Sequence, residues 1–111
     1  MSTETEIAAS EFIEKAAELI RANGWQQGSF GYESTPVCAR GAIREICRKN
    51  SFYRNPVAIL TKITKVIADQ YPEMASKSEH LSDSGKIILW NDQPGRTKEE
   101  VIAVFEKAAR S

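Results

Sequence analysis

The stretch WNDQPGRTKEEVIAVFEKA, from Trp90 to Ala108, decides the helical character of the chain and holds its densest group of turn and cap signals. Proline and glycine occupy the central positions of Gln93–Arg96, which predicts a type II turn. Thr97 is followed three residues later by Glu100, the pattern of a capping box at a helix start. Apolar residues then recur at every third or fourth position, as they do along one face of a helix. The stretch therefore predicts a tight turn that leads directly into a terminal helix.

Three segments upstream repeat this helical period between recognisable starts and stops. The first runs from Thr3 to Gly24, the second from Thr35 to Asn50, and the third from Asn55 to Pro72. Thr3 and Glu6 form a capping box at the first start. Thr-Pro and Asn-Pro begin the other two, because such a side chain caps the first turn and proline has no N–H to satisfy there.

A short fifth helix is predicted over residues 83–91. Its apolar run KIILW is too short for the period to separate a strand from a helix. A lone strand would have no partner elsewhere in the chain, which favours the helix, with Ser82 or Asp83 as its cap. We therefore predict an all-α, compact single-domain bundle over residues 1–111, with four principal helices and this short fifth.

Composition limits the classes of protein to which the chain can belong. Hydrophobic residues make up 41% of it, yet no run is long enough for a membrane span, and the start is acidic and polar, unlike a secretory signal. The two cysteines, Cys38 and Cys47, are too far apart along one predicted helix to form a disulfide. With a single histidine, His80, the sequence predicts neither a metal site nor a cofactor. We expect a soluble cytoplasmic protein.

Basic residues gather in the middle of a chain whose formal net charge is zero, since residues 37–65 carry seven bases and one acid. Arg40, Arg44 and Arg48 are spaced by four and share one helix face, with Arg54 near its end. This face is a candidate surface for phosphate, nucleic acid or an acidic partner. The alternative is a solvated face paired in part with the acids of the first helix, Glu11, Glu14 and Glu18. No aromatic residue stands among the arginines, which weakens a single-strand binding hypothesis.

Aromatic residues punctuate the loop WQQGSFGYES, which has two glycines and no helical period. Phe30 and Tyr32 are candidates for contact with a partner. The alternative is that the aromatic residues of this loop, Trp25 included, fold down as a lid over the core.

A polar group in the Trp90–Arg96 stretch is the best candidate for a small-ligand site. Arg96 would hold an anion, Asn91 and Asp92 would orient the ligand, and Trp25 or Trp90 would form a wall. The alternative is structural: Asp92 pairs with Arg96 across the turn, Asn91 caps a backbone group, and Trp90 packs in the core.

Catalytic signatures are missing from the sequence. Cys38 falls near the third position of the second predicted helix, where the helix dipole can lower a thiol pKa, but a buried structural cysteine is the favoured interpretation. His80 lies in an unrelated polar segment, and no phosphate-binding, nucleophile-elbow or zinc motif is present. The sequence therefore gives no support for an enzyme.

With these motifs in view, the chain resembles a small family of proteins from actinobacteria and the phages that infect them. The likeness is carried by GWQQGSF (Gly24–Phe30), by VCARGAI (Val37–Ile43) and by the pattern W-N-D-x-P-G-R-T-x-E-E-V that begins at Trp90, about a third of the chain together. The family has no assigned activity, so the resemblance implies no catalytic residue. It implies an intracellular protein of phage or prophage context and a framework shared by the motif residues, namely Trp25, Cys38, Gly41, Trp90, Asn91, Asp92, Gly95 and Arg96.

Three functions remain as hypotheses. The first is a non-enzymatic protein-interaction module with contacts at the arginine face and the aromatic loop. Under this hypothesis the chain is a phage-encoded modulator of a host or bacterial protein. The second is a nucleotide or nucleic-acid binder that uses Arg40, Arg44, Arg48 and Arg54. The third is a small-ligand binder or enzyme centred on Asn91, Asp92 and Arg96.

Overall fold

The computed structural model describes residues 2–31, 35–49 and 56–111, and these contain six helices and no β-strand. The helices are α1 (Ser2–Asn23), α2 (Ala39–Lys49), α3 (Val57–Gln70), α4 (Glu73–Ser78), α5 (Asp83–Asn91) and α6 (Lys98–Arg110). The predicted all-α class is confirmed for the described residues, but the expected count of four helices plus one is wrong. The additional helix is α4. Pro72, predicted only to stop the third helix, has helical backbone angles and also begins α4, because proline is tolerated at a helix start.

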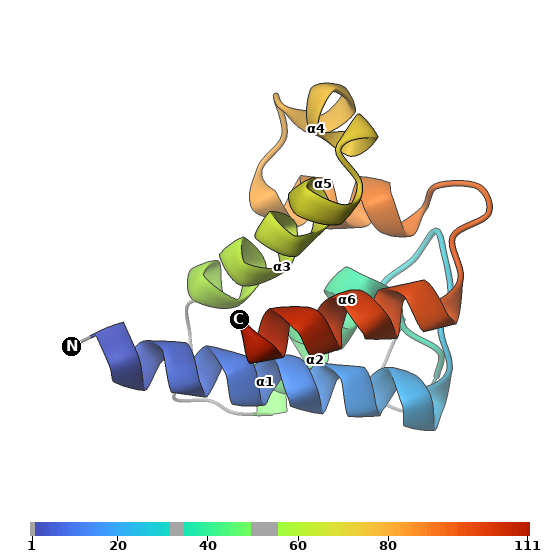
Figure 1. The fold of residues 1–111 in the computed structure, drawn as a ribbon. Coiled ribbons are helices and arrows are strands. Elements are labelled where there is room, and N and C mark those ends of the chain that lie inside the picture. Colours follow the sequence, from blue (N-terminus) through green and yellow to red (C-terminus); the bar gives the residue numbers. More distant parts are fainter. Residues whose placement is uncertain (1, 32–34, 50–55) are drawn as a thin grey trace.

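The helices form two groups that meet over the core: α1, α2 and α6 make up the first, and α3, α4 and α5 make up the second. α1 lies alongside α6 and also packs against α2 (Figure 1). α3 contacts both α1 and α6, and α5 lies beside α3 and reaches α2. α4 lies against α3 and α5 at the end of the molecule away from α1 (Figure 1).

The core lies where these groups meet. Trp90 and Phe105 are its largest fully buried side chains. Isoleucines from four helices surround them: Ile13, Ile20, Ile43, Ile59, Ile63 and Ile87. Each such side chain contributes about 1.5–3 kcal/mol by its burial. The predicted core position of Trp90 is thus confirmed.

The connection between α1 and α2 is an ordered loop that departs from the predicted helix start. Gly24, at φ +94°, ends α1 as predicted, and its N–H donates to Ile20 O at 2.8 Å. Val37 then pairs with Trp25 in an isolated parallel bridge, with backbone hydrogen bonds of 3.1 Å on both sides. This pairing keeps Val37 extended, so α2 begins at Ala39 and not after Thr35.

Cys38 is therefore the residue just before α2 and not the third residue within it. Its Sγ accepts a hydrogen bond from Gly41 N–H at 3.2 Å, which is what an N-cap side chain does. α1 includes Ser2, so it begins one residue before Thr3, close to the predicted start. α3 begins at Val57, directly after Pro56, and the predicted cap Asn55 lies outside the described residues.

The C-terminal turn and caps follow the sequence closely. Ser82 accepts from Gly85 N–H at the start of α5. Gly95 has φ +86° and Arg96 N–H donates to Gln93 O at 3.1 Å, as a type II turn requires. Both hydrogen bonds of the Thr97–Glu100 capping box are present.

None of the helices in the described ranges combines the length and the apolar composition that a membrane crossing requires.

Candidate functional site

Asn91 is the centre of a hydrogen-bond network that ties the end of α5 to the loop after α1. The residue is completely buried. Its Oδ1 accepts from Trp25 Nε1 at 2.7 Å and from the N–H of Ala39 at 2.9 Å. Its Nδ2 donates to Gln26 O at 3.2 Å and to Asp92 Oδ1 at 2.9 Å. An asparagine amide can make four hydrogen bonds, and the chain itself supplies all four partners.

Asp92 and Gln27 extend this network at the surface. Asp92 is the C-cap of α5, and its Oδ1 also accepts from the N–H of Gly28 at 3.1 Å. Gln27 Nε2 donates to the backbone oxygens of Asn91 (3.0 Å) and Gln93 (2.9 Å). The loop and the corner after α5 therefore hold each other in place through side-chain to backbone hydrogen bonds.

Arg96 is held between two aromatic rings. Its guanidinium carbon lies 4.5 Å from the ring centroids of both Tyr71 and Trp90, and these two rings meet edge-to-face at 5.5 Å. Arg96 Nε donates to Trp90 O at 2.9 Å, and its Nη1 lies 3.5 Å from the carboxylate of Glu100. Only 8% of the Arg96 side chain is exposed. The guanidinium thus acts as packing for the rings and as a donor to the backbone.

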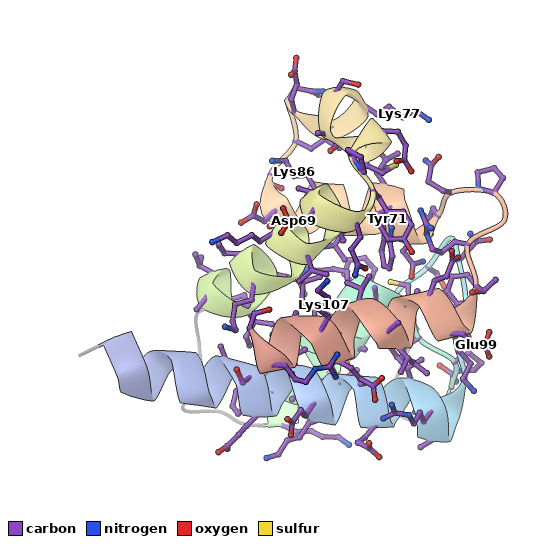
Figure 2. The ribbon with its side chains drawn as sticks, viewed as in Figure 1. Asp69, Tyr71, Lys77, Lys86, Glu99 and Lys107 are labelled. Atoms are coloured by element: carbon purple, nitrogen blue, oxygen red, sulfur yellow. The ribbon has the colours of Figure 1, made fainter. Side chains whose placement is uncertain are left out.

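The rings around Arg96 are desolvated. Burial, together with the nearby Glu100 carboxylate, raises the pKa of the Tyr71 hydroxyl. In Figure 2, Tyr71 lies in the region between α5 and α6. The indole N–H of Trp90 is buried and has no hydrogen-bond acceptor within the described ranges, a cost of about 1–3 kcal/mol that the burial of its ring must offset.

The side chains of the expected polar cluster, Asn91, Asp92 and Arg96, therefore do not form one site, because each contacts different partners. The structural alternative was right that Trp90 packs in the core and that Asn91 serves backbone groups. It was wrong that Asp92 pairs with Arg96, because Asp92 bonds to the loop and Arg96 bonds to Trp90 O and Glu100. The third member of the predicted site, Trp25, directs its indole N–H to Asn91.

The second candidate surface consists of Phe30, Arg40 and Arg44, which we call the arginine–phenylalanine face. The guanidinium carbons of Arg44 and Arg40 lie 4.9 Å and 6.0 Å from the centroid of the Phe30 ring. Arg40 Nε donates to Ser84 Oγ at 2.9 Å, and Arg44 Nη2 donates to Gly31 O at 2.8 Å. A hollow of about 430 Å³ lies beside this face, lined by Ser29, Phe30, Gly31 and Arg44.

Two glycines allow the loop to approach α2 this closely. A Cβ on Gly41 would lie 2.0 Å from Phe30 O, and the same oxygen accepts from Cys38 N–H at 3.3 Å. Gly31 has φ +81°, and a Cβ there would lie 2.0 Å from Pro36 O. Gly41, the third residue of α2, thus makes room for the loop backbone.

Glu45 pairs with two of the three arginines, Arg48 and Arg44. Arg48 Nη2 and Nε donate to the two carboxylate oxygens of Glu45 at 2.9 and 3.3 Å, and Arg44 Nε lies 3.7 Å from the same group. The Glu45 side chain is only 3% exposed. The hydrogen bond from Arg48 lowers the pKa of this carboxyl below its usual value.

Arg40 has no such acid. Within the described residues it forms no ion pair, and burial lowers the pKa of its half-buried guanidinium. The expected pairing with the acids of the first helix is not found for Arg40 or Arg44: within the described residues neither forms an ion pair with Glu11, Glu14 or Glu18, and Glu18 pairs with Arg21. The predicted contact residues Tyr32 and Arg54 lie outside the described residues.

The two cysteines are free thiols. Burial raises the pKa of Cys38 and also that of Cys47, which keeps both protonated at neutral pH and does not suit a nucleophile. No group of three or more possible metal ligands gathers in the described part of the chain.

Sequence reasoning missed three contributors to these sites. Glu45 was a lone acid among bases, and nothing in its pattern marked it as buried. Tyr71 was assigned only to a helix stripe, although it forms one side of the Arg96 enclosure. Gln26 and Gln27 were treated as ordinary loop residues, and only their place in the GWQQGSF motif could have marked them.

Comparison with known protein families gives a match that extends over all three sequence motifs. The model of a family of unknown function, DUF6197, matches residues 4–111. The chain belongs to this family. No curated protein and no solved structure gives a significant match.

Proposed function

We propose that this DUF6197 protein is a non-enzymatic protein-interaction module that binds its partner through the arginine–phenylalanine face. The observation that carries the proposal is the environment of Arg40. A half-buried guanidinium is costly without a charged partner, and within the described residues its polar contact is the neutral hydroxyl of Ser84. A carboxylate on a partner surface would supply the missing charge, as a bidentate pair or beside Arg44.

The rigidity of this face also supports a binding role. Phe30 lies on a loop that is fixed to α2 by the close approach at Gly41 and by the bond from Arg44 to Gly31 O. A surface held in one conformation before it binds loses less entropy on association. Aromatic and arginine side chains are also the types most enriched at the energetic centres of interfaces.

The context of the partner belongs to the same proposal. The resemblance to proteins of actinobacteria and their phages supports a host or bacterial protein, with the chain acting as its modulator. Two free thiols support a reducing compartment, such as the cytoplasm, as the place of this interaction.

Affinity capture with matched variants tests the proposal. The protein is immobilised as wild type, as Arg40→Gln/Arg44→Gln, and as Lys107→Gln, an exposed cation on α6 that lies outside the face (Figure 2). Quantitative mass spectrometry should find a bacterial protein retained by wild type and by Lys107→Gln, and lost from the double variant. The purified partner should then bind wild type directly. If no retained protein distinguishes the double variant from the control, the face is not the contact surface.

Single-stranded nucleic acid is a second candidate, favoured by one observation. The sequence places no aromatic residue among the arginines, but the fold brings Phe30 between Arg40 and Arg44. Binding of labelled oligothymidylate through these two cations would give a logarithmic salt slope of about −1.4. A flat anisotropy signal at about 50 mM salt would remove this candidate.

The small-ligand hypothesis has less support, because the polar atoms of Asn91 and Asp92 already form hydrogen bonds within the chain.

A further inference from the structure

A separate groove of about 710 Å³ runs between α3, α4 and α5. Its volume lies in the range of small-molecule sites. Ile67 and Met74 are almost completely buried and form the base of the groove, and the exposed methyl groups of Ala68 and Ala75 continue the apolar surface from α3 and α4. Apolar and small side chains on adjacent helices thus leave a lined hollow that the rest of the described chain does not fill.

Two lysines border this apolar base. Lys65 comes from α3 and Lys86 from α5, so two different helices bring positive charge to one groove. Neither lysine forms an ion pair within the described ranges. Of the lining residues, Glu79 alone carries a carboxylate, which leaves the lining with a net positive charge.

One of the acids next to the groove lining is already engaged, and two others, Asp69 and Glu73, form no ion pair with either of the two lysines within the described residues. Asp83, at the start of α5, accepts from the hydroxyl groups of Thr61 at 3.1 Å and Thr64 at 3.4 Å. These contacts direct its charge to the α3 hydroxyls. The two lysines therefore remain available to a ligand.

We propose that this groove binds an amphiphilic carboxylate, that is, a small molecule with an aliphatic body and one anionic group. The aliphatic body lies on Ile67, Ala68, Met74 and Ala75, where it leaves water. The carboxylate lies between Lys65 and Lys86. A flexible methionine at the base suits a range of aliphatic shapes, so the class of ligand is defined by its charge and apolar body more than by its outline.

Decanoate, used below its micelle concentration, is the probe for this proposal, and isothermal titration calorimetry measures its binding. Lys65→Met and Lys86→Met should each weaken binding roughly two- to fivefold, because each removes one solvent-exposed charge contact. Lys77→Met is the matched control, because Lys77 is on α4, does not line the groove and projects on the opposite side of α4 from Lys86 (Figure 2). Each methylene removed from the chain should weaken binding by up to about fourfold.

Two further comparisons separate this site from general stickiness. Decanol lacks the charge and should bind wild type more weakly than decanoate does. Decanol and decanoate should bind the double variant Lys65→Met/Lys86→Met with equal affinity. Ala75→Trp places a large side chain in the groove from an exposed position and should abolish binding while circular dichroism shows an intact fold. The proposal is overturned if decanoate does not bind saturably, if decanol binds as well, or if Lys77→Met weakens binding as much as Lys86→Met. The arginine–phenylalanine face is unaffected by either result.

Discussion

Replacing Asn91 with alanine should destabilise the protein far more than the loss of one polar side chain normally does. The substitution removes all four hydrogen bonds of the amide. It leaves the buried N–H of Ala39 and the part-buried Trp25 N–H and Gln26 carbonyl without their partners. An unsatisfied buried donor costs about 1–3 kcal/mol, and part-buried groups cost less because water reaches them. The sum is about 3–5 kcal/mol, a large fraction of the stability of a domain of this size.

Urea unfolding followed by far-UV circular dichroism measures this loss of free energy of unfolding. In a thermal scan, the same loss should lower the midpoint by about 15–25 °C. Gln93→Ala is the control, because the Gln93 amide makes only one long bond, to Leu89 O at 3.4 Å, and its loss should change the free energy of unfolding by less than about 0.5 kcal/mol. The indole N–H resonance of Trp25 should shift in Asn91→Ala, since it loses its acceptor. The Trp90 resonance should shift less.

Asn91→Asp separates the donor half of the amide from the acceptor half. The new side chain keeps oxygen acceptors for Trp25 and Ala39, but at neutral pH it sets a carboxylate against Gln26 O and Asp92. Its deficit should shrink as the pH falls and the introduced carboxyl becomes a donor. If Asn91→Ala lowers the free energy of unfolding by less than about 1 kcal/mol, or leaves the Trp25 resonance unchanged, Asn91 is not the centre of this hydrogen-bond network.

Three further sets of substitutions test other contacts. Gly41→Ala should cost about 2 kcal/mol or more despite its better helix propensity, because its Cβ would lie 2.0 Å from Phe30 O. Gly85→Ala should cost less than half as much, because its Cβ would lie 3.2 Å from Leu81 Cβ and needs a far smaller shift; urea unfolding compares the two. Arg96→Lys should lose about 1–2 kcal/mol in the same assay, because an ammonium cannot stack between two rings and donate in the guanidinium geometry. The carboxyl of Glu45 has a lowered folded pKa, so it stabilises the fold above its usual pKa of 4.5 and loses this effect as the pH falls through the folded value. Glu45→Gln should therefore be about 1 kcal/mol less stable than wild type at pH 7 and equally stable in acid. Arg48→Gln should reduce this difference, and the remainder comes from Arg44, which also pairs with Glu45.

The sequence by itself determined the elements whose causes are local. The C-terminal turn, the Thr97 capping box, the Ser82 cap and the glycine end of α1 depend on residues within a few positions of one another. Their hydrogen bonds close within a single turn, so a short stretch is enough to specify them. The apolar period likewise indicated the buried faces of the four principal helices, but not those of α4 and α5.

The second helix start shows where local signals failed. Thr35-Pro36 has the composition of a helix start, yet Val37 pairs with Trp25, and α2 begins only at Ala39. The bonds that outweigh the local preference come from a segment more than ten residues away. A weak local propensity cannot compete with backbone hydrogen bonds that fold a loop onto the core.

The two candidate sites were decided by tertiary structure. The sequence marked Asn91, Asp92 and Arg96 as unusual. The long-range partners of Asn91 and Asp92 are 52 to 66 residues away, and Arg96 contacts the rings of Tyr71 and Trp90. The sequence also separated Phe30 from the arginines that it contacts. Side-chain periodicity records which residues face inward, but a hydrogen bond or a ring contact depends on which distant segment packs opposite. Only the packed helices bring those segments together.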